Sequence, residues 1–124
     1  MSGWSAGELA AFDGDELQLA SYRPDGTLRP WVRIWCMTLG DDLYVRSAYG
    51  PENGWYRRAA SASRGRVRAD GLEHDVTFEA PRPEVTAPLT AAYHAKYDRY
   101  GRRIVGTVVS SEAEACTLRL VPAA

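Results

Sequence analysis

The sequence has almost no lysine. Of its 15 basic residues, Lys96 alone is lysine and the others are arginine, and 16 acidic residues bring the formal net charge to −1. A protein that binds nucleic acid through its phosphates needs a clear excess of positive charge. The charge balance therefore argues against nucleic acid as a partner, and any cationic function must be local.

Cysteine and histidine are also scarce. Cys36 and Cys116 both lie in apolar, strand-like runs, and neither has a histidine or a second cysteine at metal-ligand spacing. We expect two small buried hydrophobic side chains and no metal. The glycine pattern of a nucleophile elbow is missing too, which argues against a hydrolase of that type.

Long apolar runs are absent from the sequence. The first twelve residues, MSGWSAGELAAF, show no basic region followed by an apolar core and a cleavage site. No later run approaches the length that crosses a membrane. We therefore expect a cytoplasmic protein without a membrane partner.

The composition is that of an ordinary globular domain. The chain has 124 residues, of which 45% are hydrophobic and 25% are charged. This length can bury one sizeable core without help from a metal or a disulfide. We expect residues 1–124 to form a single domain.

Short alternating segments dominate the chain and predict antiparallel strands joined by tight turns. The expected strands are 16–23, 28–39, 43–48, 66–71, 73–80 and 116–121, and the expected short helices are 8–12, 55–62 and 85–97. An open six-stranded sheet with so few helices would leave its edges and one face bare. The pattern predicts a mainly β protein built as a six-stranded antiparallel β-barrel.

The segment RPWVRIW is unusual for a strand. At a period of two, Arg29, Trp31, Arg33 and Trp35 share one face, and the alternate positions are apolar. Guanidinium forks and indole rings suit a planar, anionic ligand. In the alternative, the tryptophans pack under a helix and the arginines extend into solvent.

The loop SAYGPENGWY combines a strand end, a glycine turn and a helix start with Asn53 as the expected N-cap. Free amides and the helix dipole at such a site favour a phosphate, although the loop could simply cap the helix. A meander of strands brings Arg29 and Arg33 close to Ser47 and Ala48.

Three motifs carry a family resemblance: DGTLRPWVRIW, DDLYVRSAYGPENGWYRRA and GRVRADGLEHDVTFEA. In this order and spacing, the chain from 17 to 121 resembles the split β-barrel proteins related to pyridoxamine-phosphate oxidase. It is most similar to their deazaflavin-dependent nitroreductase and quinone-reductase branch, and within it to the family called domain of unknown function 2255.

The resemblance implies a cofactor, either flavin mononucleotide (FMN) or a deazaflavin coenzyme. Together with the motifs above, it predicts a cofactor-binding set that consists of Arg29, Trp31, Arg33, Ser47, Ala48, Tyr49, Gly50, Asn53, Trp55 and Tyr56. Flavin-binding relatives often carry a lysine where this chain has Tyr49, which would either lower its affinity for the phosphate or reflect loss of the cofactor in this family. Relatives of this fold often form homodimers, so we expect one here.

The resemblance also implies that Tyr93, Tyr97 and Tyr100 border the substrate side as catalytic residues. A tyrosine hydroxyl can donate a hydrogen bond to an acceptor oxygen as negative charge develops. The same stripe could simply pack its helix against the barrel.

These observations leave two main hypotheses for the function. The first is an oxidoreductase in which a flavin or deazaflavin delivers hydride to a quinone, a nitro compound or another planar conjugated acceptor. The second is a non-catalytic barrel that binds a planar anionic ligand. A nucleic-acid contact through Arg64, Arg66 and Arg68 is the least favoured reading, because these residues alternate as an ordinary outward strand face.

Overall fold

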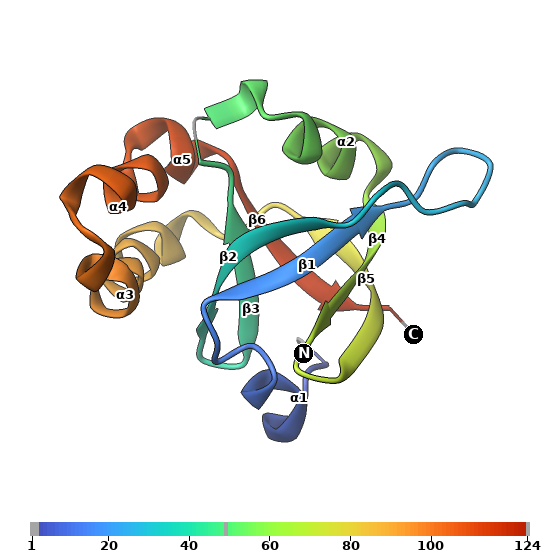
Figure 1. The fold of residues 1–124 in the computed structure, drawn as a ribbon, viewed down its shortest axis with the longest axis horizontal. Helices are drawn as coiled ribbons and strands as arrows, with labels where there is room; N and C mark the ends of the chain where they lie inside the picture. The colour runs from blue at the N-terminus through green and yellow to red at the C-terminus, as the bar shows by residue number, and fades with distance from the viewer. Residues whose placement is uncertain (1–2, 49, 124) are drawn as a thin grey trace.

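The computed structural model describes residues 3–48 and 50–123. Six antiparallel strands form a closed barrel in the order β1-β2-β3-β6-β5-β4, and β4 pairs back onto β1 (Figure 1). The strands are β1 (Glu16–Ser21), β2 (Val32–Leu39), β3 (Asp42–Arg46), β4 (Arg64–Ala69), β5 (Leu72–Glu79) and β6 (Thr117–Pro122). The predicted six-stranded antiparallel barrel is confirmed.

The turns follow the local sequence. Asp70 and Gly71 join β4 to β5 with φ angles of 47° and 83°, the conformation that a two-residue hairpin requires. In the loop between β1 and β2, the Asp25 carboxylate accepts hydrogen bonds from the Thr27 amide and hydroxyl. Side-chain bonds of this kind replace the backbone pairing that a turn lacks.

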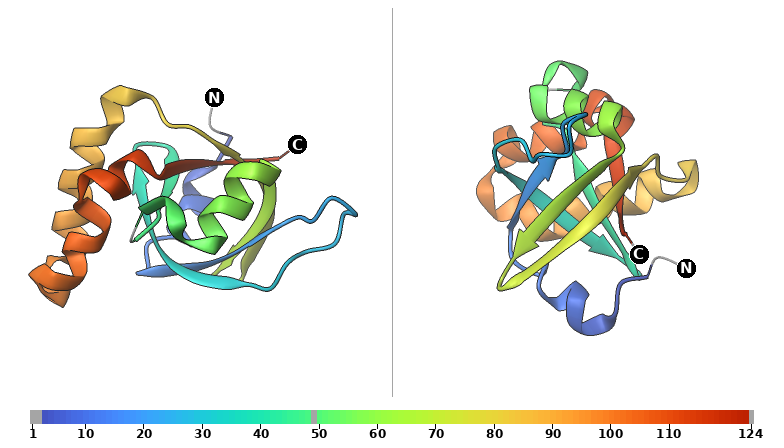
Figure 2. Two further views of the ribbon diagram at one scale, coloured as in Figure 1. Left: turned by 90° about the horizontal axis from the view of Figure 1, so that it is seen from above. Right: turned by 90° about the vertical axis from the view of Figure 1, so that its right-hand side faces the viewer.

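The barrel interior holds the main core, and two helices close its ends. Helices α1 (Ala6–Ala10) and α2 (Gly54–Ala62) lie at opposite ends of the barrel (Figures 1 and 2). Near α1, the Trp4 indole donates to the Leu120 carbonyl over 2.7 Å. At the other end, Trp55 of α2 is buried in the same core. The barrel is therefore a packed interior and not a channel.

A second core lies outside the barrel, on β2 and β3. Helices α3 (Thr86–Tyr97), α4 (Arg102–Val109) and α5 (Ser111–Ala115) gather on this side of the barrel (Figures 1 and 2). Short 3₁₀ turns lie at η1 (Gly50–Glu52), η2 (Pro83–Val85) and η3 (Asp98–Tyr100). The second core consists of Met37, Tyr44, Leu89, Tyr93, Tyr97, Val105 and Val108. The outer face of β2 and β3 is thus buried under helices.

The structure differs from the sequence prediction at two places. Arg29 and Trp31 precede β2, because Pro30 has no amide proton for strand pairing. The expected row of two arginines and two tryptophans along one strand is therefore wrong in its first half. Helices α4 and α5 were not predicted, since Gly106 and the β-branched residues of α4 lower its helix propensity. Packing of Val105 and Val108 on the barrel stabilises α4 despite this propensity.

Both cysteines are buried and unpaired, as predicted. No helix in the described part of the chain is long and apolar enough to cross a membrane.

Gly65 offers a test of the barrel packing. A Cβ atom at this position would lie 2.3 Å from the Ala20 carbonyl oxygen and 2.7 Å from the Phe78 ring. Gly65→Ala should lower the free energy of unfolding by about 1–3 kcal/mol, the usual cost of overpacking. Gly106→Ala is the control, because a Cβ there has no atom within 4 Å and alanine favours the helix. Denaturant unfolding of both variants measures the difference, and a Gly65→Ala protein as stable as the control would contradict this packing.

Candidate functional site: two cavities at the start of helix α2

A groove of about 410 Å³ runs between β2, the start of α2 and α4. We call it the apolar groove, because six of the residues that line it are Val32, Ile34, Trp35, Trp55, Ile104 and Val108. Glu16, Arg33, Arg46, Ala48, Asn53 and Thr107 complete the lining. Its volume lies within the range of small-molecule sites.

Trp35 supplies a rigid flat wall to this groove. Its ring stacks on Tyr97 with a centroid distance of 4.0 Å and an interplanar angle of 7°. Tyr97 in turn contacts the ring of Tyr93 at 5.7 Å, deeper in the second core. Ile104 of α4 also lines the groove and is 50% exposed, an unusual exposure for a large apolar side chain. A planar molecule would find apolar contacts on both β2 and α4.

Arg46 is a buried cation in the same lining. Its side chain is 3% exposed, and its Nε donates to the Thr117 hydroxyl over 3.1 Å. Its Nη1 donates to the Thr90 hydroxyl and the Val108 carbonyl, and its Nη2 donates to the Thr86 carbonyl. Burial lowers the pKa of Arg46 from its ordinary value. All four hydrogen-bond acceptors around this charge, two hydroxyls and two backbone carbonyls, are neutral groups.

The sequence analysis did not select Arg46. The available signal was its place on the outer face of a strand, where a polar residue normally faces water. Only the position of α3 and α4 over that face reveals that the guanidinium is buried.

A second cavity, which we call the arginine pocket, lies on the other side of the start of α2. It encloses about 640 Å³. Five arginines line it, namely Arg23, Arg29, Arg57, Arg58 and Arg64, together with Tyr22, Pro24, Gly54, Ser61 and Ala62. None of these lining residues is acidic. The pocket is thus a local concentration of positive charge in a chain whose net charge is −1.

Arg29 has an incomplete set of hydrogen bonds. Its Nε is buried and has no partner among the described residues. A buried N–H group without an acceptor costs about 1–3 kcal/mol. Such an unpaired donor in a cationic pocket is suited to an anionic ligand.

The start of α2 also lacks the side-chain hydrogen bond that caps a helix. Asn53 occupies the N-cap position but makes no side-chain cap hydrogen bond, and its Nδ2 donates to the Ala48 carbonyl over 3.3 Å instead. The first turn of α2 holds no acidic residue. A Cβ on Gly54 would lie 2.9 Å from Nη1 of Arg58, so a guanidinium lies at the positive end of the helix dipole. An anion at this point would satisfy both the amides and the arginine.

The predicted cofactor-binding residues separate into groups. Arg33, Ala48, Asn53 and Trp55 line the apolar groove, whereas Arg29 lines the arginine pocket. The two cavities share the start of α2, since Gly54 in the pocket lies between two groove residues in the sequence.

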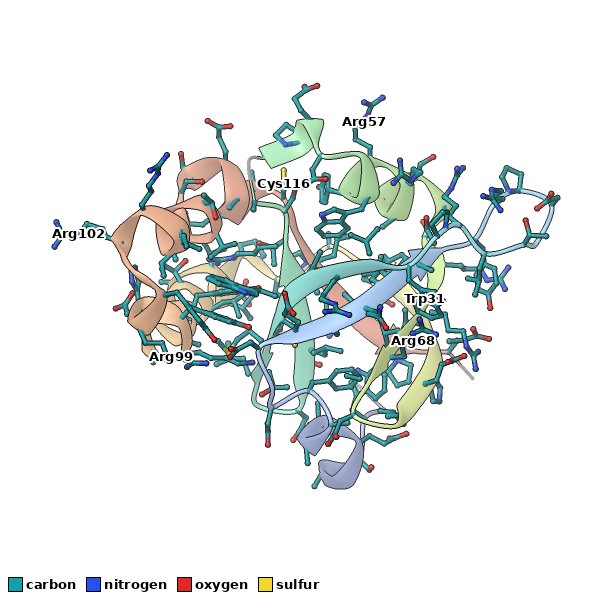
Figure 3. All side chains as sticks on the ribbon, viewed as in Figure 1. Trp31, Arg57, Arg68, Arg99, Arg102 and Cys116 are labelled. Atoms are coloured by element: carbon teal, nitrogen blue, oxygen red, sulfur yellow. The ribbon has the colours of Figure 1, made fainter. Side chains whose placement is uncertain are left out.

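Four further predicted residues line neither of these two cavities. Trp31 lies under the guanidinium of Arg68, at 4.1 Å from its ring centroid, on the surface of the barrel (Figure 3). The Ser47 hydroxyl donates to the Gly50 carbonyl over 2.6 Å, so these two residues stabilise the loop itself. Tyr56 packs edge-on against Trp55. Tyr49 is outside the described residues.

The tyrosine stripe is divided between core and surface. Tyr93 and Tyr97 are 0% exposed, and burial raises the pKa of both. Tyr100 is 42% exposed, and its hydroxyl donates to the Asp15 carboxylate. None of these three tyrosines lines the apolar groove. A catalytic role of Tyr93 or Tyr97 would require its side chain to become exposed, and the catalytic role of the stripe stays a prediction.

Comparison with known proteins identifies the family to which this chain belongs. Residues 8–120 match the family model described as "Uncharacterized protein conserved in bacteria (DUF2255)". The chain belongs to this family. No curated protein sequence gives a significant match.

Solved structures share the fold. An F420 reductase is 19% identical with a TM-score of 0.62, and the match covers 98% of this chain and 97% of that one. A FAD-binding protein from Mesorhizobium loti is 13% identical with a TM-score of 0.58, covering 98% and 91%. A conserved hypothetical protein from Mycobacterium tuberculosis is 16% identical with a TM-score of 0.54, covering 98% and 81%. At these identities, the likeness shows a common fold.

Tyr97 provides a test of the tyrosine positions. Its hydroxyl oxygen accepts from the Cys36 amide at 3.1 Å, and it lies 2.5 Å from the Cys36 carbonyl and 2.6 Å from the Asp15 carbonyl. Tyr97→Phe should lower the free energy of unfolding by about 1–3 kcal/mol, because buried backbone groups lose their partner. Tyr100→Phe is the matched control with an exposed ring, and thermal unfolding compares the two. Equal stability of both variants would show that the Tyr97 hydroxyl is not structural.

Proposed function

We propose that this protein binds a flavin or deazaflavin coenzyme and uses it to reduce a planar conjugated acceptor such as a quinone or a nitro compound. The ring system would occupy the apolar groove, and the phosphate would occupy the arginine pocket. When bound, such a coenzyme supplies hydride transfer, in which two electrons and a proton pass to the acceptor.

The observation that carries this proposal is the arginine pocket beside an uncapped helix. Five arginines gather in a pocket whose lining holds no acidic residue, the carboxylates of Asp25 and Asp75 interact with only Arg23 and Arg64 among them, and Arg58 lies unfavourably at the start of α2. Natural proteins retain such destabilising arrangements where function requires them. Bidentate guanidinium groups and free helix amides are the donors that bind a phosphate.

The apolar groove offers the flat apolar surface and the hydrogen-bond donors that the ring system of the coenzyme needs. Trp35 offers a flat surface that its stacking on Tyr97 keeps in one orientation. Asn53 and Arg33, at the same groove, can donate hydrogen bonds to polar edges of a ring. Groove and pocket meet at the start of α2, which suits one molecule with an apolar ring and an anionic chain. The names of the F420 reductase and the FAD-binding protein, which share this fold, support the choice of coenzyme class.

A non-catalytic binding module remains the second candidate, and one observation favours it. Tyr93, Tyr97 and Tyr100 are absent from the lining of the groove, so the predicted catalytic residues are not among those that would surround a bound ring. Turnover of a quinone by the protein loaded with reduced coenzyme separates the two candidates. Tight coenzyme binding without turnover would establish the binding module.

Comparison of FMN with riboflavin tests the two-cavity arrangement, because these molecules differ only in the phosphate. Tryptophan and coenzyme fluorescence are followed during titration with FMN, riboflavin and a deazaflavin coenzyme. We expect FMN to bind more tightly than riboflavin by about 1.5–3 kcal/mol, the range for charged hydrogen bonds. Failure of all three to bind at about 1 mM, where binding is worth only about 4 kcal/mol, would reject the proposed function.

Arg29 should contribute to phosphate binding and not to stability. Arg29→Ala removes a buried unpaired donor, so the melting temperature should stay equal or rise. The same change should weaken the binding of FMN by about 1.5–3 kcal/mol and leave the binding of riboflavin unchanged. Arg102→Ala is the control, since Arg102 lies at the exposed end of α4, away from α2 (Figure 3). A loss of stability with unchanged FMN affinity would assign Arg29 to packing.

A further inference from the structure

The apolar groove contains a buried charge that the proposed coenzyme site does not itself require. Arg46 is 3% exposed, whereas Glu16 and Arg33, the other charged residues of the lining, are exposed. Exposed charges are screened by water and salt, but a buried charge acts through a medium of low dielectric constant. Arg46 is therefore the charge of this lining whose field is screened least.

The positive charge of Arg46 is only partly balanced. Its four hydrogen bonds go to two hydroxyls and two backbone carbonyls, which carry dipoles but no net charge. The carboxylate that balances it is Glu114 of α5, which reaches it through Thr90. The Thr90 hydroxyl accepts from Arg46 over 2.8 Å and donates to Oε2 of Glu114 over 2.7 Å. A guanidinium keeps its proton at neutral pH, so a net positive field remains at the groove.

We propose that Arg46 sets the charge preference of the apolar groove, so that a planar ring bearing a negative charge binds more tightly than the same ring when neutral. Glu114, acting through Thr90, limits this preference. The inference rests on the proposed function and deepens it. A flavin ring that takes up a hydride gains one negative charge unless a second proton follows, and Arg46 would then favour the reduced form over the oxidised form.

Riboflavin is the probe for this inference, because it lacks the phosphate and does not engage the arginine pocket. Its dissociation constant is measured in the oxidised form and, without oxygen, in the reduced form at a pH where the reduced ring is anionic. We expect the reduced form to bind at least about tenfold more tightly, equivalent to a rise in midpoint potential of about 30 mV for a two-electron couple.

Glu114→Gln is the decisive variant, since it removes the balancing charge and keeps an acceptor for the Thr90 hydroxyl. It should increase the ratio of the dissociation constant of the oxidised form to that of the reduced form by about threefold or more. The reason is that less negative charge then balances the positive charge of Arg46. Glu112→Gln is the control on the same helix: it removes the same charge from an exposed residue that has no bond to Thr90. The control should leave the ratio unchanged.

Arg46→Met supplies the opposite change, and the ratio should fall toward one if the variant folds. If it does not fold, Glu114→Gln and its control decide the question. Equal binding of both forms by the wild type, or a ratio unaffected by Glu114→Gln, overturns the inference and leaves the proposed function standing. Failure of riboflavin to bind in either form overturns the inference, whereas the proposed function falls only if FMN and the deazaflavin coenzyme also fail to bind.

Discussion

Closure of the barrel is the constraint on which the rest of the structure depends. Because β4 pairs with β1, every strand has two neighbours and the sheet has no free edge. The interior is then filled by side chains and cannot hold a ligand. The outer face of β2 and β3 carries Met37 and Tyr44, which must be buried by helices. The two candidate cavities lie instead at the start of α2, and one of them is also lined by β2 and α4.

The start of α2 shows a conflict between stability and binding. A stable helix start carries a capping side chain and acidic residues, and α1 follows this rule with a complete capping box of Ser5 and Glu8. At α2, by contrast, Asn53 turns its amide toward Ala48, and Arg58 lies at the positive end of the helix. Serine side chains cap α1 and α5, whereas α2, α3 and α4 have no side-chain cap. Among the uncapped starts, that of α2 adjoins the arginine pocket, and this position supports a ligand role for it.

Arg46 and the arginine pocket represent two distinct uses of positive charge. The pocket arginines are mostly exposed or half-buried, so water screens them until an anion arrives. Arg46 is instead enclosed by neutral dipoles, and its carboxylate partner lies one hydroxyl away at Glu114. A charge held in this way keeps its field at the groove surface, because a direct ion pair would cancel most of it. Position in the fold, and not residue type, separates these roles.

Local chemistry determined much of the fold in advance. Alternating apolar residues, the Asp70–Gly71 turn and the Ser5–Glu8 cap act over a few residues, and for that reason the six strands and three of the helices could be predicted. Strand pairing placed Arg33 close to the loop that carries Ala48, whereas Asn53 and Trp55 were assigned to the site through the family resemblance.

Only the tertiary structure decided the rest. Helix α4 is stabilised by burial of Val105 and Val108 on the barrel, a contact that its local sequence does not reveal. The burial of Arg46 depends on α3, α4, α5 and β6 arriving from distant parts of the chain. Trp31 and Trp35 fall on the same face at a strand's period of two. In the structure, however, Trp31 lies under Arg68 and Trp35 lines the groove. The sequence by itself determined which residues form strands and turns, whereas long-range packing determined which polar side chains face water, core or ligand.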